Sequence, residues 1–277
     1  SIIVFVLKGF NLGVDFKGGT LIEIRTTEEV KISQIRQSFL KLNLGDLSVK
    51  KFGKENDFLV KFELNKSSDS NFIKSINNKV SADIGSDVNF RRVENVGPKV
   101  SKELLKAGLL AISFSLAAML FYIWIRFEWQ FSLAAIIALI HDVIITIGIF
   151  SFLSFEVNLS IVAAVLTIVG YSMNDTVVIF DRIRENLRKY LKVPLTDVLN
   201  TSINETLSRT LITSITTLLA LLSIYFFGGQ ILKGFSFAMI IGVVVGTYSS
   251  IFVATPILNY TKVNSKTVLK EDNNEVV

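Results

Sequence analysis

Long apolar runs dominate the chain beyond residue 102 and predict membrane-spanning helices. About 20 consecutive apolar residues are enough to cross a bilayer. The stretches that meet this length are Glu103–Ile125, Phe131–Leu153, Val157–Phe180, Thr206–Phe227 and Gly234–Leu258. Residues 1–7 are apolar but too short to span, and we interpret 1–8 as the C-terminal remnant of a first transmembrane helix. The pattern predicts a polytopic α-helical membrane protein, with a five-helix transmembrane region over 99–260 and a tail over 261–277.

Residues 9–98 have a different pattern, in which short alternating runs are mixed with helical periodicity. Alternation of apolar and polar residues predicts strands over 11–25, 46–52, 58–64 and 87–93, with Gly18-Gly19 as a turn or bulge. Apolar spacing of three and four predicts helices over 30–42 and 68–80, the second capped by Ser68 or Asp69. The order βαββαβ is the ferredoxin-like α+β pattern, which ends at the break Asn95-Val-Gly-Pro98.

The distribution of basic residues predicts the orientation of the spans. The link 181–205 is basic, and so is the tail after Tyr260, whereas the turn 154–158 holds no basic residue and the turn 228–233 holds one. Basic loops stay on the cytoplasmic side. We therefore expect a bacterial inner-membrane protein with 9–98 in the periplasm and the C-terminus in the cytoplasm. The link is also expected to carry its own amphipathic helix, with Val198, Ile203 and Leu207 on one face.

One acid stands within an apolar span. Asp175 is the only ionisable residue of the run 157–180, and a carboxyl at such depth is costly unless it is paired or functional. Arg209 begins the next apolar run from the same side of the membrane, so the two side chains can meet if their helices are neighbours. We expect this pair to serve proton transport, and a structural ion pair between two helices is the alternative.

Other polar residues inside the spans are weaker candidates. His141 and Asp142 lie in the middle of the run 131–153, where each belongs either to a proton path or to helix packing. Ser172, Asn174 and Thr213 lie near the Asp175–Arg209 pair and are suited to a wet path. The alternative for a hydroxyl in a membrane helix is a hydrogen bond to its own backbone.

The last apolar run carries small residues at four-residue spacing. They are Gly234, Ala238, Gly242 and Gly246, and such a ridge permits close helix packing. The chain has no cysteine and one histidine, scattered carboxylates give no metal-ligand spacing, and no hydrolase, zincin or phosphate-loop motif is present. We expect no metal, no cofactor and no enzyme activity. The positive charges of 8–102 are interspersed with acids and form no basic stripe, which argues against nucleic-acid binding.

Several motifs together resemble a known family. They are Gly13-Val-Asp-Phe-Lys-Gly-Gly-Thr20, Val96-Gly-Pro98, His141-Asp-Val143, Gly170-Tyr-Ser-Met-Asn-Asp-Thr-Val-Val-Ile-Phe-Asp-Arg-Ile-Arg-Glu-Asn186 and Thr206-Leu-Ser-Arg-Thr-Leu-Ile-Thr-Ser214. This set closely resembles the SecD/SecF family of protein-export membrane subunits, in the RND-like superfamily. The likeness runs from about Lys8 to Tyr260, and the family has six spans, of which the first is incomplete here.

The resemblance implies a function and partners. It implies an auxiliary subunit of the Sec protein translocase that pairs with SecD and uses the proton motive force to complete export of unfolded polypeptides through SecYEG, with YajC and YidC as further possible partners. It also implies that Asp175 and Arg209 serve proton transport. Two alternatives stay open: an RND-type exporter of small molecules or lipids, and a scaffold of the export channel that transports nothing.

Overall fold

The computed structural model describes residues 9, 11–53, 55–63, 70–261, 263, 264 and 268. The chain forms two compact units. One, the small unit, is Leu12–Leu109, and the other, the helical unit, contains Asn11 and the described residues from Leu110 onward. Residues 1–8, expected to end a first transmembrane helix, lie outside the described residues.

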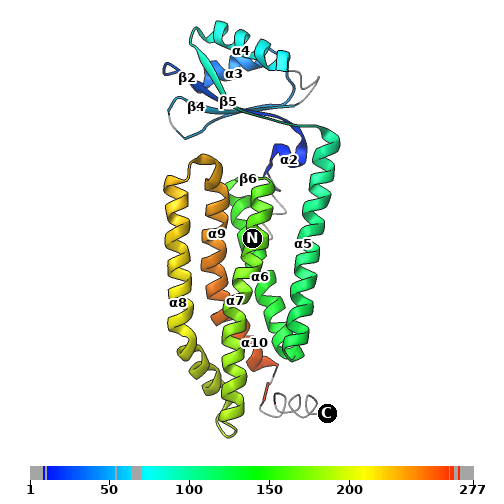
Figure 1. The fold of residues 1–277 in the computed structure, drawn as a ribbon, viewed down its shortest axis with the longest axis vertical. Coiled ribbons are helices and arrows are strands. Elements are labelled where there is room, and N and C mark those ends of the chain that lie inside the picture. Colours follow the sequence, from blue (N-terminus) through cyan, green and yellow to red (C-terminus); the bar gives the residue numbers. More distant parts are fainter. Residues whose placement is uncertain are drawn as a thin grey trace. The chain divides into compact units, whose positions relative to one another are not determined.

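The small unit is a four-stranded antiparallel sheet with two helices (Figure 1). Its strands are β2 (Gly19–Thr26), β3 (Leu47–Lys51), β4 (Asp57–Phe62) and β5 (Val88–Val96), in the spatial order β3-β4-β2-β5. Helices α3 (Ile32–Leu40) and α4 (Ser70–Ile84) follow β2 and β4 in the sequence. The register places Ile22 opposite Val60 on one side and Val93 on the other.

The core of the small unit lies between the sheet and these helices. Alternate strand residues and one face of each helix meet there, since strand side chains point alternately to opposite faces. The fully buried members include Ile22, Ile24, Ile35, Phe39, Phe58, Val60 and Val80. The predicted helical faces of 30–42 and 68–80 thus supply core residues. The caps expected for the second helix, Ser68 and Asp69, lie outside the described residues.

The strand expected over 11–25, with its break at Gly18-Gly19, is found after the break, but the part before it is wrong. The segment is divided into β1 (Asn11–Leu12), a one-turn helix α2 (Val14–Lys17) and β2. Gly18 and Gly19 have φ of 79° and 120°, a region that glycine enters easily and other residues rarely do. The two glycines therefore end α2 and redirect the chain into the sheet, and this allows Val14 and Phe16 to be buried.

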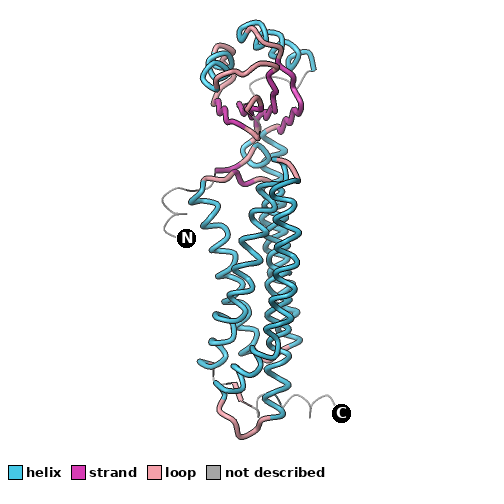
Figure 2. Tube along the Cα trace, turned by 90° about the vertical axis from the view of Figure 1, so that its left-hand side faces the viewer, coloured by secondary structure: helices cyan, strands magenta, loops and turns pink. Residues whose placement is uncertain are grey.

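The helical unit is built from long apolar helices (Figures 1 and 2). The helices are α5 (Pro98–Arg126), α6 (Trp129–Leu153), α7 (Leu159–Lys189), α8 (Leu195–Phe227) and α9 (Gln230–Ser249), of which α5 begins in the small unit. A π-helical turn, η1 (Ser250–Ala254), connects α9 to α10 (Thr255–Tyr260). Five of the described helices are long and apolar enough to cross a membrane, the last of them spanning Ile231–Tyr260. A polytopic helical membrane protein is therefore confirmed.

Polar and small residues end these helices. Ser154, which follows α6, is left-handed with φ 55°. The two-residue strand β6 (Glu156–Val157) comes next, and Asn158 then caps α7 by accepting a hydrogen bond from the Ile161 amide at 3.2 Å. Pro194 precedes α8, where its missing N–H is harmless.

The separate amphipathic helix expected in the link 181–205 is not found. Helix α7 continues to Lys189 and α8 already begins at Leu195, so only five residues connect them. Polar side chains hold the two helix ends together: Arg182 Nε binds Glu205 Oε2 at 2.6 Å, and Asn186 Nδ2 binds Ser202 Oγ at 3.0 Å. The amphipathic pattern around Val198 is that of the first turns of α8, whose apolar face packs on α7.

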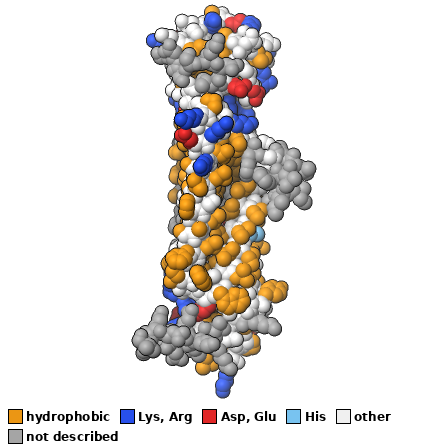
Figure 3. Space-filling model, turned by 90° about the vertical axis from the view of Figure 1, so that its right-hand side faces the viewer, with side chains coloured by type: hydrophobic (Ala, Val, Ile, Leu, Met, Phe, Trp, Pro, Cys, Tyr) orange, Lys and Arg blue, Asp and Glu red, His pale blue; other side chains and the backbone are white. Residues whose placement is uncertain are grey.

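The interior of the helical unit lies mainly between α6, α7 and α9. Phe127, Phe131 and Phe180 form an aromatic cluster with ring centroids 5.1–5.9 Å apart. In contrast, α5 and α8 leave most of their apolar side chains uncovered. Figure 3 shows apolar side chains spread over one face of this unit. Lipid or another apolar partner suits such surfaces.

Candidate functional site: two buried acids between the helices

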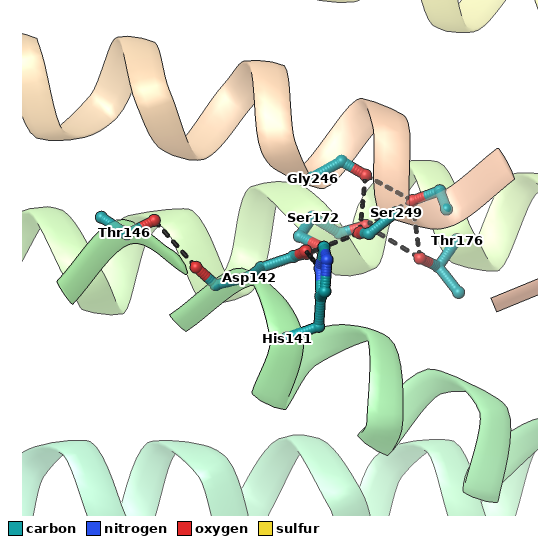
Figure 4. A network of polar contacts seen from close by, with 8 residues as sticks. His141, Asp142, Thr146, Ser172, Thr176, Gly246 and Ser249 are labelled. Carbon is teal, nitrogen blue, oxygen red and sulfur yellow. Dashed lines mark hydrogen bonds and ion pairs between the residues drawn. The ribbon is translucent and has the colours of Figure 1, made fainter. Parts of the chain in front are cut away.

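Asp142 is completely buried and connects three helices (Figure 4). Its Oδ2 atom accepts hydrogen bonds from Ser172 Oγ of α7 at 2.6 Å and from Ser249 Oγ of α9 at 2.7 Å. Its Oδ1 atom lies 2.9 Å from Nδ1 of His141. These contacts satisfy the carboxyl group, which would otherwise be costly in an apolar environment.

His141 leans along α6 towards its neighbour. Its side chain is 29% exposed, whereas that of Asp142 is fully enclosed. Adjacent helical residues point about 100° apart, and the contact forms because the ring reaches around the helix. The structure thus joins this expected pair into one polar group with Ser172, but it does not bring the group to Arg209.

Asp175 is the second buried acid, with 2% of its surface exposed. Its hydrogen-bonding neighbours are Asn174 on its own helix, Ser214 on α8 and Thr247 on α9. Thr247 Oγ1 donates to Asp175 Oδ2 at 3.5 Å and lies 2.7 Å from Ser214 Oγ. Neutral donors from three helices therefore surround this carboxyl group.

Arg209 interacts with Asp175 electrostatically, but no ion pair within 4 Å joins them among the described residues. Arg209 is exposed and lines a groove of about 520 Å³ with Asn174 and Asp181. The remaining lining comes from α5 and α7 and is mostly apolar, with Met119, Tyr122 and Met173 among it. The structure therefore places Arg209 in one groove with Asn174, the neighbour of Asp175, but shows no direct Asp175–Arg209 contact among the described residues.

The threonines of α8 mostly bind their own backbone. Thr213 Oγ1 donates to the Thr210 carbonyl at 3.0 Å, and Thr216 Oγ1 to that of Ile212 at 2.8 Å. Thr217 is an exception in part, because its hydroxyl also accepts from Tyr171 Oη at 3.2 Å. At Thr213 the structure therefore shows the hydrogen bond to the helix's own backbone that was the alternative to a place in a proton path.

Sequence reasoning missed the hydroxyls of α9 and Ser214. Thr247, Ser249 and Ser250 lie on one turn and bind partners on α6, α7 and α8. The signal available was the polar run Thr247-Tyr-Ser-Ser250 inside an otherwise apolar span. Such a run resembles ordinary backbone-bonded serines until the neighbouring helices are known.

The small-residue ridge of α9 lies against α7. A Cβ atom on Gly242 would come 2.2 Å from Ile168 Cγ1, and one on Gly246 would come 3.0 Å from Ser172 Cβ. A Cβ atom on Gly234 would reach Ile161 Cδ1 at 3.4 Å, and Ala238 is fully buried. The absence of side chains at these positions lets the two backbones approach, so that short hydroxyl side chains can reach across.

Two family models match the chain. The model described as "Protein export membrane protein SecD/SecF, C-terminal" matches residues 76–264, and the "SecD/SecF GG Motif" model matches residues 3–30. The first contains both buried acids and Arg209, and the second contains Gly18 and Gly19.

Curated relatives are similar over nearly the whole chain. The Protein translocase subunit SecF of Rickettsia bellii (strain OSU 85-389) is 46% identical over 264 residues, which are 93% of this chain and 86% of the relative. The protein of the same name from Rickettsia rickettsii (strain Sheila Smith) is also 46% identical, over 93% of this chain and 85% of its own length. That of Cereibacter sphaeroides is 43% identical, over 95% and 84%.

Solved structures show the same fold. The crystal structure of SecDF, a translocon-associated membrane protein from Thermus thermophilus, is 36% identical with a TM-score of 0.85. It matches 94% of this chain, which spans only 36% of the SecDF chain. A SecDF structure in a super-membrane-facing form is 35% identical over 98% of this chain, with a TM-score of 0.66. The chain therefore belongs to the SecD/SecF family of protein export membrane proteins.

Proposed function

We propose that this chain acts in Sec-dependent protein export, as an auxiliary subunit without enzyme activity in the bacterial inner membrane. Its family and the names of its relatives support this role. The solved SecDF chain is described as translocon-associated, and this chain corresponds to about a third of it. A SecD-type subunit is therefore the proposed immediate partner, and SecYEG the channel that the two assist.

We propose further that the complex uses the proton motive force through Asp175 and Arg209. The observation that carries this proposal is the setting of Asp175. It is buried among neutral hydrogen-bond donors, it interacts electrostatically with Arg209, and no ion pair holds it within the part of the chain that the structure describes. Such a carboxyl group can gain or lose a proton without first breaking a salt bridge. Arg209 lines an open groove and has room to move towards or away from it.

The proposed orientation places the small unit in the periplasm and the α7–α8 connection in the cytoplasm. The connection favours this, since Arg188 and Lys189 end α7 and Lys192 follows them. We also assign the small unit to the ferredoxin-like class. Its element order and the antiparallel order β3-β4-β2-β5 support that assignment.

The uncovered apolar faces of α5 and α8 support contacts with lipid and with SecD. Leu109, Phe114 and Trp124 on α5 are more than half exposed, as are Ile212 and Leu219 on α8.

The small unit is proposed to bind unfolded exported polypeptide. YajC and YidC are further proposed partners.

The test is proton flux through vesicles that contain this chain and its SecD partner. Asp175→Asn and Arg209→Met should each abolish gradient-dependent flux and export while assembly with SecD persists. Asp197→Asn is the matched control, because it neutralises an exposed acid at the start of α8 and should leave flux unchanged. Loss of assembly in the first two variants would instead identify a structural pair. Normal flux in Asp175→Asn would leave a scaffold role as the explanation.

A further inference from the structure

One turn of α9 touches both buried acids. Within residues 246–250, Thr247 Oγ1 donates to Asp175 at 3.5 Å, and Ser249 Oγ donates to Asp142 at 2.7 Å. Thr247 and Ser249 are two residues apart and therefore point to different sides of the helix. The turn thus lies between the two acids, so a shift of the turn changes the contacts of both.

Helix α7 connects the same acids on its own side. Ser172, which donates to Asp142 at 2.6 Å, lies three residues before Asp175 and shares its face of the helix. Gly246 lies so close to Ser172 that an added Cβ would come within 3.0 Å of the serine Cβ. The crossing of α7 and α9 is therefore tight where the two polar groups meet. A displacement of either helix caused by a change at Asp142 should therefore also displace the residues around Asp175.

The helical hydrogen-bond pattern of α9 changes directly after this turn. Ser250 Oγ donates to the Gly246 carbonyl at 2.9 Å, Ser249 Oγ lies 3.1 Å from the same oxygen, and the π-helical turn Ser250–Ala254 follows. Ser250 Oγ lies 2.8 Å from Thr176 Oγ1 of α7. A π turn inside a helix is a departure from the regular pattern that is frequent at functional sites. Side-chain contacts with neighbouring helices therefore help to fix the position of the 246–250 turn, since the π-helical turn interrupts regular bonding before it resumes in α10.

We propose that Asp142 is a positioning residue for Asp175: by binding Ser172 and Ser249 it fixes the 246–250 turn of α9 and so places the Thr247 hydroxyl against Asp175. The inference rests on the proposed function, because it takes Asp175 as the carboxyl group that carries the transported proton. It adds a second buried acid that never carries the transported proton but determines the setting of the one that does.

The charged and titratable groups that interact with these acids are few. Among the described residues, Asp142 interacts with His141 on its own helix and with the serine hydroxyls of Ser172 on α7 and Ser249 on α9. Asp175 has Arg209 on α8, and its other neighbours are neutral. Any pH response measured at Asp175 must therefore come from Asp175 itself, from Arg209, or from the Asp142–His141 pair acting through α9.

The test reads Asp175 directly in the full chain, in native membranes with its partner. An apolar carbodiimide modifies protonated carboxyl groups, and mass spectrometry gives the modified fraction of Asp175 as a function of pH. Asp142→Asn and Ser249→Ala should move the half-reaction pH in the same direction by at least about 0.5 unit, about a threefold change in proton affinity. Ser236→Ala is the matched control, because Ser236 is a buried serine of α9 whose hydrogen bonds, within the described part of the chain, go to its own helix backbone.

A double-mutant cycle tests the route. In a Thr247→Val background the effect of Asp142→Asn should vanish, because the hydroxyl through which it acts is gone. An unchanged half-reaction pH in Ser249→Ala, an equal shift with and without Thr247, or an Asp175 that reacts at no pH would each overturn the proposal. Because the assay measures Asp175 and not export, a positive result would hold even if export proved independent of the gradient.

Discussion

Replacing Gly242 with alanine should destabilise the helical unit, because α7 leaves no space for a methyl group there. The new Cβ would lie 2.2, 2.4 and 2.8 Å from three side-chain carbons of Ile168. Ordinary contact between carbons is about 3.5–4.0 Å, so a separation of more than 1 Å must be gained. Ile168 is 1% exposed and cannot swing into solvent or lipid. Either the isoleucine leaves its rotamer or the two helices move apart.

The magnitude follows from two opposing effects. Overpacking of a tight core costs about 1–3 kcal/mol, while alanine in place of glycine inside a helix gains about 0.5–1 kcal/mol. Gly170 of α7 supplies the comparison, since nothing lies within 4 Å of the position that its methyl group would take. Gly170→Ala should therefore be neutral or slightly stabilising. The free energy of unfolding of Gly242→Ala should lie about 1–3 kcal/mol below that of Gly170→Ala.

The assay is reversible denaturant unfolding of the full chain in detergent micelles, followed by helical circular dichroism. Ile168→Val in the Gly242→Ala background removes one of the clashing carbons and should recover part of the loss. Equal unfolding free energies for the two glycine variants would refute the close contact of α7 and α9. So would a failure of Ile168→Val to change the outcome, because the clash would then lie elsewhere.

Two further predictions concern the small unit of the full chain. Gly19→Ala should speed amide hydrogen exchange in β2 more than Gly85→Ala does. Both glycines have positive φ, but of the two only the Gly19 methyl would meet a backbone atom, the Phe62 carbonyl oxygen at 2.7 Å. Equal exchange rates in the two variants would contradict this prediction. The hydrogen bond from Lys41 lowers the pKa of Asp83 below its ordinary value. The resulting stabilisation is complete above the unfolded-state pKa of about 3.9 and is lost as pH falls through the folded-state pKa. Asp83→Asn should therefore flatten the acid side of the protection profile of α4, and an unchanged profile would show that the ion pair contributes nothing.

The acids of the candidate site could be found from the sequence, whereas their partners could not. Asp142 and Asp175 stand out because a carboxyl group in an apolar span is expensive and rare. Ser249 and Thr247 do not, since a hydroxyl in a membrane helix usually bonds its own carbonyl, as Thr213 does. Which hydroxyls reach across depends on the rotation of α9 against α7, and the sequence contains no direct measure of that rotation.

The fold was predictable to a similar extent. Long apolar runs and strict alternation located the spans and the strands, because burial of a whole face imposes the period. The short helix α2 was missed, since four residues are too few to show a period and its end depends on the φ angles of Gly18 and Gly19. The start of α8 was also missed. The pattern of residues 195–205 predicts a separate amphipathic helix, but these residues form the first turns of α8, which side-chain bonds such as Arg182–Glu205 connect to α7.

The lengths of α7 and α8 bear on how the protein sits in the bilayer. At about 1.5 Å per residue, helices of 31 and 33 residues are about 46 and 50 Å long, against a hydrocarbon thickness of about 30 Å. Unless strongly tilted, the paired ends must project through the lipid headgroups. Arg182 and Glu205 bind one another in this projecting part, so the hairpin is braced where water would otherwise loosen it. Because this ion pair connects the two helix ends, they should move together as one rigid hairpin. A tilt of α7 or α8 around Asp175 would then displace the projecting hairpin, which a soluble partner can contact.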